Sequence, residues 1–416
     1  FHFDDGTEFD YGGTLEDVLS EIERVEPGDV AGYERMLIHS KRLFDAGFVD
    51  LADQPFHNPL KMIKQIPRLI RLQSYRSVWS MVSKYLKNDK LRQAFSVQPL
   101  LVGGSPFDTT SIYGLIHYLE REWGVYFARG GTGAVVAALG ELMREQGIHV
   151  RTGISVSSVL IDGRQVRGVE LEGGEKIQSD IVISNADPMH LYNEMIDKKH
   201  QSVALRFKSK KMRLSMGLFV LFFGTERNYP DVAHHTIILG KDFRGLLDDI
   251  FHKKIMSDDF SLYLHRPTAT DSSFATPGCD SFYVLCPVPN LDSDVDWAIE
   301  GPRLQAAIID RLQQSLLPEL RTVIRSDFYM TPEDFAQNYL SHHGAGFSVA
   351  PYFTQSAWFR FHNLADSLRG LYLTGAGTHP GAGLPGVLCS AKVIERIVPD
   401  PRIRTNLEFG LSNPVN

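Results

Sequence analysis

Several features that mark specialised proteins are scarce or missing in this chain of 416 residues. Its three cysteines, Cys279, Cys286 and Cys389, make no even set and no CxxC or Cys/His spacing, which argues against a disulfide scaffold and a zinc module. No stretch reaches the roughly 18 to 20 apolar residues of a membrane-spanning helix. The acidic balance, with 43 basic against 50 acidic residues, argues against a nucleic-acid partner. We therefore expect a cytoplasmic protein whose membrane contact is peripheral.

The remaining composition is that of an ordinary globular protein, with 43% hydrophobic and 22% charged residues. The chain begins at Phe1, without methionine, in the strand-like FHFDDGTEFDYGG, where the pair Asp5-Gly6 predicts a hairpin turn. A natural N-terminus rarely begins inside a strand. The sequence is therefore expected to be a fragment that has lost its beginning.

Helical patterns dominate the sequence as far as Trp123. The first helix is expected between Thr14, a capping residue, and Pro27. Gly130 and Gly131 open a further amphipathic helix, which passes directly into a short strand at 148–153. A helix followed at once by a strand is typical of α/β architecture.

Strand patterns follow. An Asp162-Gly163 turn separates two hairpin strands, and the apolar run 181–184 predicts a buried strand of a parallel sheet. Residues 213–288 contain longer candidates rich in aromatic and β-branched residues, which predict a second, antiparallel sheet.

The last third of the sequence begins with a helix expected over 302–317, and an irregular stretch follows it. A strand at 370–375 and a helix from about Gly386 to Ile397 close the fold. The polar tail after Pro399 is expected to be weakly ordered.

The densest glycine cluster of the chain lies in LYLTGAGTHPGAGLPGVLCSA, residues 371–391. Gly381, Gly383 and Gly386 fit the dinucleotide pattern GxGxxG literally, but no second strand of a βαβ unit follows them. The wider pattern is a buried strand that delivers a glycine-rich turn to a helix start, where backbone N–H groups can face a ligand. The alternative is a plain tight connection.

A second candidate site is Ser184, Asn185 and Asp187, which follow the strand at 181–184. Polar groups at the carboxyl end of a parallel strand lie where open α/β folds bind ligands. The alternative, which the sequence alone favours, is an Asx turn or helix cap before Pro188.

The segment 57–92 is strongly basic and also rich in apolar and aromatic residues. Basic amphipathic helices of this composition lie on anionic lipid, whereas the alternative is a solvated helix face packed on the core. Against the single acid Asp89, its basic residues are Lys61, Lys64, Arg68, Arg71, Arg76, Lys84, Lys87, Lys90 and Arg92.

Two His-His pairs, at 234–235 and 342–343, are the only clustered histidines in the sequence. Adjacent side chains on a regular element point apart, so no metal site is expected. No nucleophile arrangement stands out, and no catalytic acid or base is assigned.

With these residues in view, the chain resembles the bacterial carotenoid desaturases, specifically phytoene desaturases of the bacterial and fungal type, within the flavoprotein amine-oxidase-like superfamily. The resemblance spans most of residues 27–395. The strings that carry it are LRQAFSVQPLLVGGSPF, SIYGLIHYLEREWGVYFARGGTGAVV, ISNADP, DDFSLYLHRPTATDSS, TQSAWFR and LYLTGAGTHPGAGLPGV.

The resemblance implies an FAD-dependent oxidoreductase that desaturates phytoene toward lycopene or a related polyene by hydride transfer to the flavin. The family's own FAD-binding βαβ unit lies before the point where this chain begins, in agreement with the expected fragment. The remaining flavin-facing positions correspond to Gly130, Gly131, Val156, Ser184, Asn185, Ala186, Asp187, Thr374, Gly375, Gly377, Thr378, Gly381, Gly383, Pro385, Gly386 and Val387.

The resemblance also implies an α/β fold in two parts. A discontinuous, doubly wound FAD-binding domain, incomplete at its N-terminus, is expected from 127–187 and 346–398. A mixed-sheet and helical substrate domain is expected from 1–126, which is mostly helical and membrane-associating, and from 188–345. The tail is 399–416. The oligomeric state is left open.

A carotenoid hydrocarbon has no polar atom, so it can be held only by shape and apolar burial. A wall for it is expected from Phe219, Phe222, Phe223, Phe282 and Tyr283, and segment 57–92 is expected to dock on the membrane and admit the substrate. Two alternatives stay open: a related desaturase or dehydrogenase acting on another carotenoid backbone, and a flavin-less, lipid-associating remnant without enzymatic activity.

Overall fold

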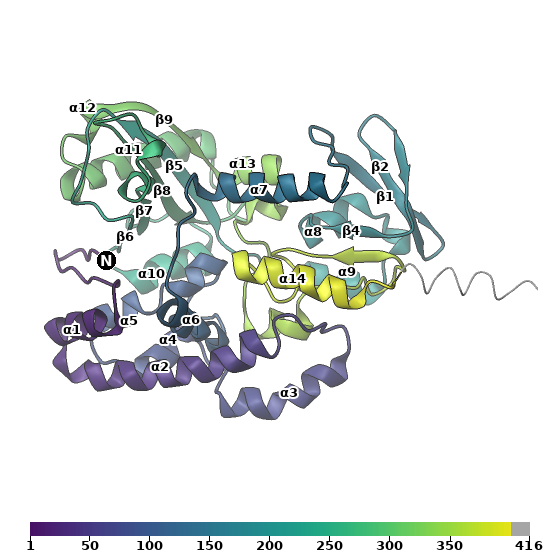
Figure 1. Cartoon of the computed structure of the whole chain (residues 1–416), viewed down its shortest axis with the longest axis horizontal. Coiled ribbons are helices and arrows are strands. Elements are labelled where there is room, and N and C mark those ends of the chain that lie inside the picture. Colours follow the sequence, from purple (N-terminus) through teal and green to yellow (C-terminus); the bar gives the residue numbers. More distant parts are fainter. Residues whose placement is uncertain (401–416) are drawn as a thin grey trace, which may run out of the picture.

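The computed structural model describes residues 1–400. Helices are the main elements of its first 123 residues (Figure 1). Thr14 caps the first helix as expected: its hydroxyl accepts from the Asp17 N–H, and the Asp17 carboxylate accepts from the Thr14 N–H. Most of the tail, 401–416, lies outside the described residues. The helices of this part are α1 (Leu15–Val25), α2 (Val30–Phe44), α3 (Pro59–Arg71), α4 (Val78–Tyr85), α5 (Asp89–Ala94) and α6 (Leu115–Trp123).

The predicted N-terminal hairpin is confirmed. The Phe1 amine donates to the Phe9 carbonyl over 2.8 Å, and Gly6 turns the chain with φ +81°. His2 also pairs in parallel with Ile238, so the hairpin lies against the edge of the large sheet.

The large sheet is antiparallel throughout, as predicted, with the strand order β6-β7-β8-β5-β9. Alternate side chains face opposite sides: Phe219 and Leu221 pack against the helix α11 (Trp297–Ser315), whereas Leu218 and Val220 pack against the N-terminal helices and α10 (Phe243–Asp248). The strands are β5 (Gly217–Thr225), β6 (His235–Ile238), β7 (Leu262–His265), β8 (Asp280–Val288) and β9 (Ile324–Met330).

The strand β9 lies in the stretch that was expected to be irregular, so that expectation is wrong. It is an edge strand whose side chains are mostly exposed, Phe328 by 60%, and the alternation that signals a half-buried strand is therefore weak. Two short helices flank it, α12 (Leu320–Val323) and α13 (Pro332–Tyr339).

Besides the two hydrophobic cores on the faces of the large sheet, a third core lies at the other end of the molecule (Figure 1). Here β4 (Val182–Ser184) pairs in parallel with β10 (Leu371–Leu373), and a three-stranded antiparallel sheet packs beside them. That sheet consists of β1 (Val156–Asp162), β2 (Gln165–Leu171) and β3 (Lys176–Gln178). The helices of this part are α7 (Gly131–Glu145), α8 (Pro188–His190), α9 (Val203–Lys211) and α14 (Leu384–Ile397).

The third core contains side chains from both sides of the expected domain boundary at 187/188, including Met189 and Leu191 with Val166 and Leu371. The division of the chain into two domains, each built from two segments, stays a prediction.

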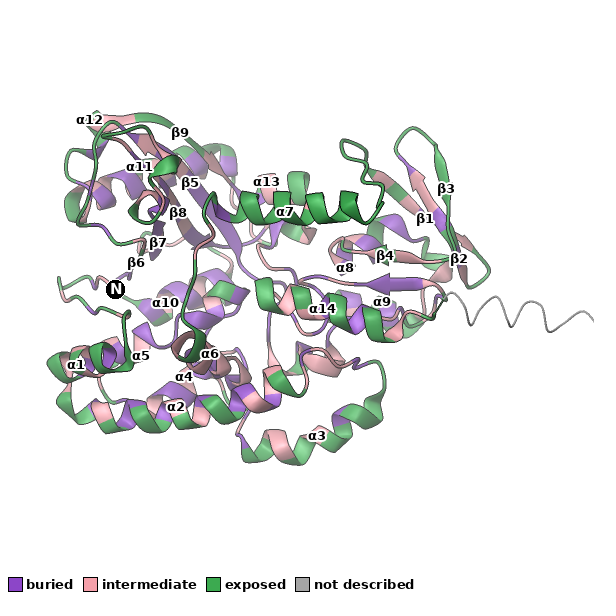
Figure 2. Ribbon diagram, in the orientation of Figure 1, coloured by how far each residue is buried: buried purple, intermediate pink, exposed green. Residues whose placement is uncertain are grey.

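Two strand expectations in this part are wrong in detail. Residues 148–153 form no strand among the described residues, because no neighbouring segment pairs with them. The strand β4 is parallel as predicted but not buried: Ile183 is 50% exposed, since one face of the two-stranded sheet is uncovered in the described structure. The helix α7 is likewise exposed along its length, apolar side chains included (Figure 2).

No helix among residues 1–400 is both long and apolar enough to cross a bilayer.

Candidate functional site

The carboxyl ends of β4 and β10 lie side by side and bring two predicted segments together. The Thr374 N–H donates to the Ser184 carbonyl over 2.9 Å. At Gly375 an added Cβ would stand 2.0 Å from the Asn185 Oδ1, and φ is +95°, so this position requires glycine. The sequence predicted polar groups at the ends of two separate strands, and in the structure both sets lie at the same edge of the two-stranded sheet.

Local hydrogen bonds use part of this polar set. The Asp187 carboxylate accepts from the Met189 N–H over 2.8 Å and caps α8, and the Ser184 hydroxyl accepts from the Ala186 N–H over 3.2 Å. The helix-cap alternative for this segment is therefore confirmed. It leaves the Asn185 side chain facing Gly375.

The glycine-rich turn is held against the start of α14. The Ser390 hydroxyl accepts from the Gly375 N–H over 2.9 Å. A Cβ at Gly386 would lie 2.8 Å from the Gly381 carbonyl oxygen, so Gly386 is needed to close the turn. Gly383, the N-cap residue with φ +93°, is less confined: an added Cβ would meet only Val102, at an ordinary van der Waals distance of 3.6 Å. Gly383 and Gly386 both line a cavity in front of this turn.

A cavity of about 560 Å³ lies in front of this turn. Its lining is mostly apolar and comes from α3, α6 and the turns around them, with Gly383 to Gly386 on one side. Residues that line it include Phe48, Phe56, Met62, Leu69, Ile116, Leu119, Tyr126 and His379. The cavity is therefore suited to an apolar ligand that reaches the glycine-rich turn.

The predicted aromatic wall does not line this cavity. Phe219, Phe223 and Phe282 are buried between the large sheet and α11, and Phe222 and Tyr283 pack against the core of the N-terminal helices. The expectation is wrong for Phe219, Phe223 and Phe282, because strand alternation turns these rings to the face of the sheet that α11 covers. For Phe222 and Tyr283, which are half-buried on the other face, it stays a prediction.

Arg360, in the string TQSAWFR, is buried beneath the glycine-rich turn, with 1% of its surface exposed. It donates to the carbonyls of Val349 and Ala376 over 3.0 and 2.6 Å, but its Nε and Nη1 have no partner. Burial lowers its pKa, the attraction of Tyr113 and Asp187 opposes this shift, and no carboxylate among residues 1–400 lies within ion-pair distance of it. A buried cation without a direct ion-pair partner is costly, so an anionic group at this turn would be stabilised. Sequence reasoning missed this residue.

Helix α3 carries the first half of the basic segment and forms part of the cavity wall with Met62 and Leu69. Its other faces are exposed: Leu60, Ile63, Ile66 and Ile70 expose 62%, 56%, 42% and 58% of their surface. Lys61, Lys64 and Arg71 are also exposed, whereas Arg68 is paired with Asp50 over 2.6 Å.

The second half of the basic segment is tied to the protein. The Arg92 guanidinium donates to the Leu86 carbonyl, and the Lys90 ammonium bonds to Asp5 and Thr7. The solvated-face alternative fits this half, and α3 is the part of segment 57–92 that presents basic and apolar groups together.

Glu120 is the carboxyl residue among those that line the described cavity. Burial raises its pKa to about 7, although the Tyr11 hydroxyl, which donates to its Oε2 over 3.2 Å, opposes the shift. A carboxyl group in this range can hold or release a proton at neutral pH. The sequence shows only an acid in LEREW and carries no signal of this environment.

We expect Glu120→Gln to stabilise the protein at about pH 8 and to leave stability unchanged at about pH 4. The folded-state pKa of about 7 lies above the ordinary 4.5, so the free energy of unfolding of the wild type falls as pH rises between these values. The neutral amide removes that loss, on the order of 3 kcal/mol, while its oxygen still accepts from Tyr11. Urea unfolding at both pH values measures the change in stability. The control is Glu122→Gln, the same change at an exposed carboxyl group. A less stable Glu120→Gln at pH 8 would contradict the assignment.

Three of the predicted flavin-facing residues, Gly130, Gly131 and Val156, contact parts of the protein other than the glycine-rich turn. The Gly130 N–H donates to the Asp271 carboxylate over 2.8 Å, and a Cβ at Gly131 would approach Phe274 to 2.9 Å. Val156 is the first residue of β1, and it pairs with Leu171.

The expectation that adjacent histidine rings point apart is wrong for both pairs. The ring centroids are 4.4 Å apart in His234–His235 and 4.2 Å apart in His342–His343. His234 precedes the strand β6, and His343 has φ +52°, so in neither pair do both residues lie on one regular element. Strand alternation therefore does not apply to them.

Comparison with known proteins assigns this arrangement to a family. The profile described as flavin containing amine oxidoreductase matches residues 42–393. The lycopene-forming phytoene desaturase of Pantoea ananas is 44% identical over 94% of this chain and 80% of its own length. The neurosporene-forming phytoene desaturase of Cereibacter sphaeroides is 40% identical over 97% and 79%. The chain belongs to the carotenoid desaturases of the flavin containing amine oxidoreductase family.

The fold of this carotenoid desaturase agrees with that family. Wild-type putrescine oxidase bound to putrescine superposes with a TM-score of 0.56 over 95% of this chain and 80% of that one, at 10% sequence identity. The expected α/β flavoprotein fold is thereby confirmed, as is the expectation of an FAD-dependent oxidoreductase.

The residues of this desaturase fit an FAD group at the glycine-rich turn. Gly383 lines the cavity at the start of a 14-residue helix, and the unpartnered Arg360 nitrogens lie beneath the same turn. Backbone N–H groups at a helix start and a guanidinium both stabilise the anionic parts of a dinucleotide cofactor.

Proposed function

We propose that this chain desaturates phytoene, converting C–C single bonds into the conjugated double bonds of lycopene or a shorter polyene. The observation that carries the proposal is the apolar cavity that runs from α3 to the glycine-rich turn. The relatives at 44% and 40% identity are named for this reaction, the first forming lycopene and the second neurosporene.

Each desaturation removes a hydride equivalent and a proton from two neighbouring carbons. Bound FAD supplies the hydride acceptor, which no side chain can replace. The apolar lining of the cavity positions the hydrocarbon and excludes water. Arg360 contributes positive charge under the turn, and the Glu120 carboxylate on the cavity wall takes the proton.

The residues that hold FAD are, in this proposal, those around the joined ends of β4 and β10 and the start of α14. They are Ser184, Asn185, Ala186, Asp187, Thr374, Gly375, Gly377, Thr378, Gly381, Gly383, Pro385, Gly386 and Val387. For Gly130, Gly131 and Val156 the assignment rests on the family resemblance.

A hydrocarbon substrate resides in lipid, so the proposal includes a docking surface. Helix α3 combines four exposed aliphatic side chains with Lys61, Lys64 and Arg71, and its inner side lines the cavity. This favours a cytoplasmic protein that lies on the membrane through α3 and draws the substrate past Met62 and Leu69.

The complete reading frame, expressed in cells that accumulate phytoene, should give coloured carotenoid, and the purified protein should carry the flavin absorption bands. The visible spectrum of the extract reports how many double bonds are conjugated and therefore which polyene forms. Colourless cells containing folded, flavin-loaded protein would contradict the proposed reaction. Protein that neither carries nor takes up FAD would favour the flavin-less alternative.

A further inference from the structure

Three histidines meet on the antiparallel sheet, away from the residues that line the cavity. His235 is the first residue of β6 and lies directly opposite His265, the last residue of β7, while His234 precedes β6. The ring centroid of His265 is 4.6 Å from that of His234 and 5.3 Å from that of His235. Residues thirty positions apart are thus joined by the register of one strand pair.

The ring nitrogens of this group are arranged so that several are free. His234 Nδ1 bonds to the Thr270 hydroxyl and His235 Nδ1 to the Tyr263 hydroxyl, each over 2.6 Å. In the tautomer with the proton on Nδ1, each Nδ1 donates to its hydroxyl and each Nε2 keeps a lone pair for a ligand. His265 is only 7% exposed, yet neither of its ring nitrogens has a hydrogen-bond partner. An unpartnered polar group in a buried position is costly, so this ring needs a ligand that the protein itself does not supply.

We propose that His234, His235 and His265 bind a divalent transition-metal ion, of which Zn²⁺ is the representative. Three imidazoles are the ligand set that such borderline-soft ions take, with a fourth position open to water. The hydroxyls of Thr270 and Tyr263 act as outer partners that fix the ring orientation of two ligands. Neither the family nor the proposed reaction requires this ion.

The spacing of the three ligand atoms is close to that of a metal site. They all lie within 4.8 Å of one another. Nitrogens around a tetrahedral zinc stand about 3.3 Å apart, so binding requires the ligand atoms to approach one another by up to about 1.5 Å. His234 is half-buried and His235 is exposed, so small rotations of these two side chains can make this movement while their backbone stays in place.

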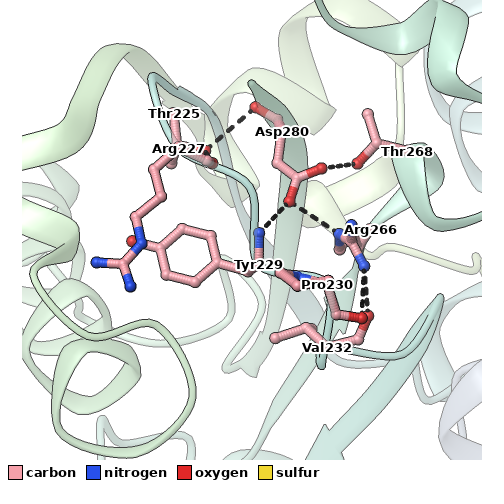
Figure 3. Close-up of polar contacts among 8 residues, drawn as sticks. All are labelled: Thr225, Arg227, Tyr229, Pro230, Val232, Arg266, Thr268 and Asp280. Atoms are coloured by element: carbon pink, nitrogen blue, oxygen red, sulfur yellow. Dashed lines mark hydrogen bonds and ion pairs between the residues drawn. The ribbon is translucent and has the colours of Figure 1, made fainter. Parts of the chain in front are cut away.

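A buried ion pair holds that loop in place (Figure 3). Arg266, which follows His265, donates from Nε to Asp280 over 2.9 Å and from Nη1 to the Val232 carbonyl over 2.8 Å. The Asp280 carboxylate also accepts from the Tyr229 N–H over 2.7 Å. The loop that carries His234 is thereby fixed to β7 and β8 from two sides.

The backbone adds a direct link to the histidine group, because the Arg266 N–H donates to the His234 carbonyl over 2.9 Å. Ligands supported in this way are preorganised, and preorganisation is what separates a built metal site from histidines that merely lie near one another.

The test uses the untagged full chain, stripped with a chelator and titrated with Zn²⁺ while metal content is measured. We expect one ion per chain, and a Tm that rises with added Zn²⁺. Titration with Co²⁺ should produce the intense visible bands of a tetrahedral nitrogen site. His265→Gln should weaken binding by more than about 100-fold.

Two further variants keep the test decisive. His234→Gln removes a ligand from the loop without opening the core, and it should weaken binding similarly and abolish the Tm rise. The double variant His342→Gln/His343→Gln, which removes the other adjacent pair, should bind Zn²⁺ as the wild type does. Fewer than about 0.1 ions per wild-type chain, or unchanged affinity in His234→Gln, would overturn the proposal. A loss confined to the 342–343 variant would overturn it as well.

Discussion

Replacing Asp280 by alanine should lower the free energy of unfolding by about 3–5 kcal/mol, the range measured when one partner of a buried ion pair is removed. Asp280 is 2% exposed and accepts from Arg266 Nε, the Thr268 hydroxyl and the Tyr229 N–H. Its loss leaves the Arg266 guanidinium, 9% exposed, without a counter-charge. Urea unfolding monitored by circular dichroism measures the change.

The double variant Arg266→Met/Asp280→Leu should recover a large part of that loss, because it removes both charges and leaves neither unpaired. Asp258→Ala is the matched control: this carboxylate pairs with Arg303 on the surface, with 92% of its side chain exposed, and its removal should have no measurable effect. An Asp280→Ala protein as stable as the control variant would show that the buried pair does not stabilise the fold.

Reversing Lys61, Lys64 and Arg71 to glutamate should weaken binding to anionic vesicles by at least about 100-fold. Each basic residue near an anionic surface contributes about 1 kcal/mol, so three of them account for about two powers of ten, and the introduced acids add repulsion. Arg68 is left in place because its pair with Asp50 fastens α3 to the protein. Vesicle co-sedimentation at low and high salt measures the effect.

The matched control reverses three exposed lysines outside α3, Lys87, Lys176 and Lys241, and so makes the same change in net charge. We expect this variant to retain most of its vesicle binding, because charges farther than a Debye length of about 8–10 Å from the contact are screened. Equal losses in the two variants would mean that net charge, rather than α3, governs binding. Flavin content should be unchanged in both.

Much of the local structure follows from short sequence rules. Thr14 and Asp17 form a capping box, Asp5-Gly6 forms a hairpin, and the alternation in β5 directs its side chains to opposite cores. These features depend on residues within a few positions of one another. The family, and with it the flavin chemistry, is likewise readable from contiguous strings such as the glycine-rich turn after β10.

The hydrophobic periodicity of a segment does not show which other elements pack against its apolar face. The run at 181–184 is apolar enough for a buried strand, but Ile183 is half exposed in the described structure. The aromatic residues of β5 and β8 that face α11 suit a substrate wall as well as a core, and packing against α11 decides for the core. The segment 57–92 is basic throughout, yet Arg92 and Lys90 bond to other parts of the protein. Most basic and aliphatic side chains of α3 are exposed instead.

The sequence by itself determined the helix caps, the turns, the antiparallel sheet and the family, because each depends on neighbouring residues or on an uninterrupted motif. Tertiary structure alone decided the shape of the cavity, the pKa of Glu120, the unpartnered nitrogens of Arg360 and the meeting of His234 with His265. Desolvation and unpaired hydrogen-bonding groups depend on atoms that are distant in sequence. No local pattern encodes which distant atoms these are.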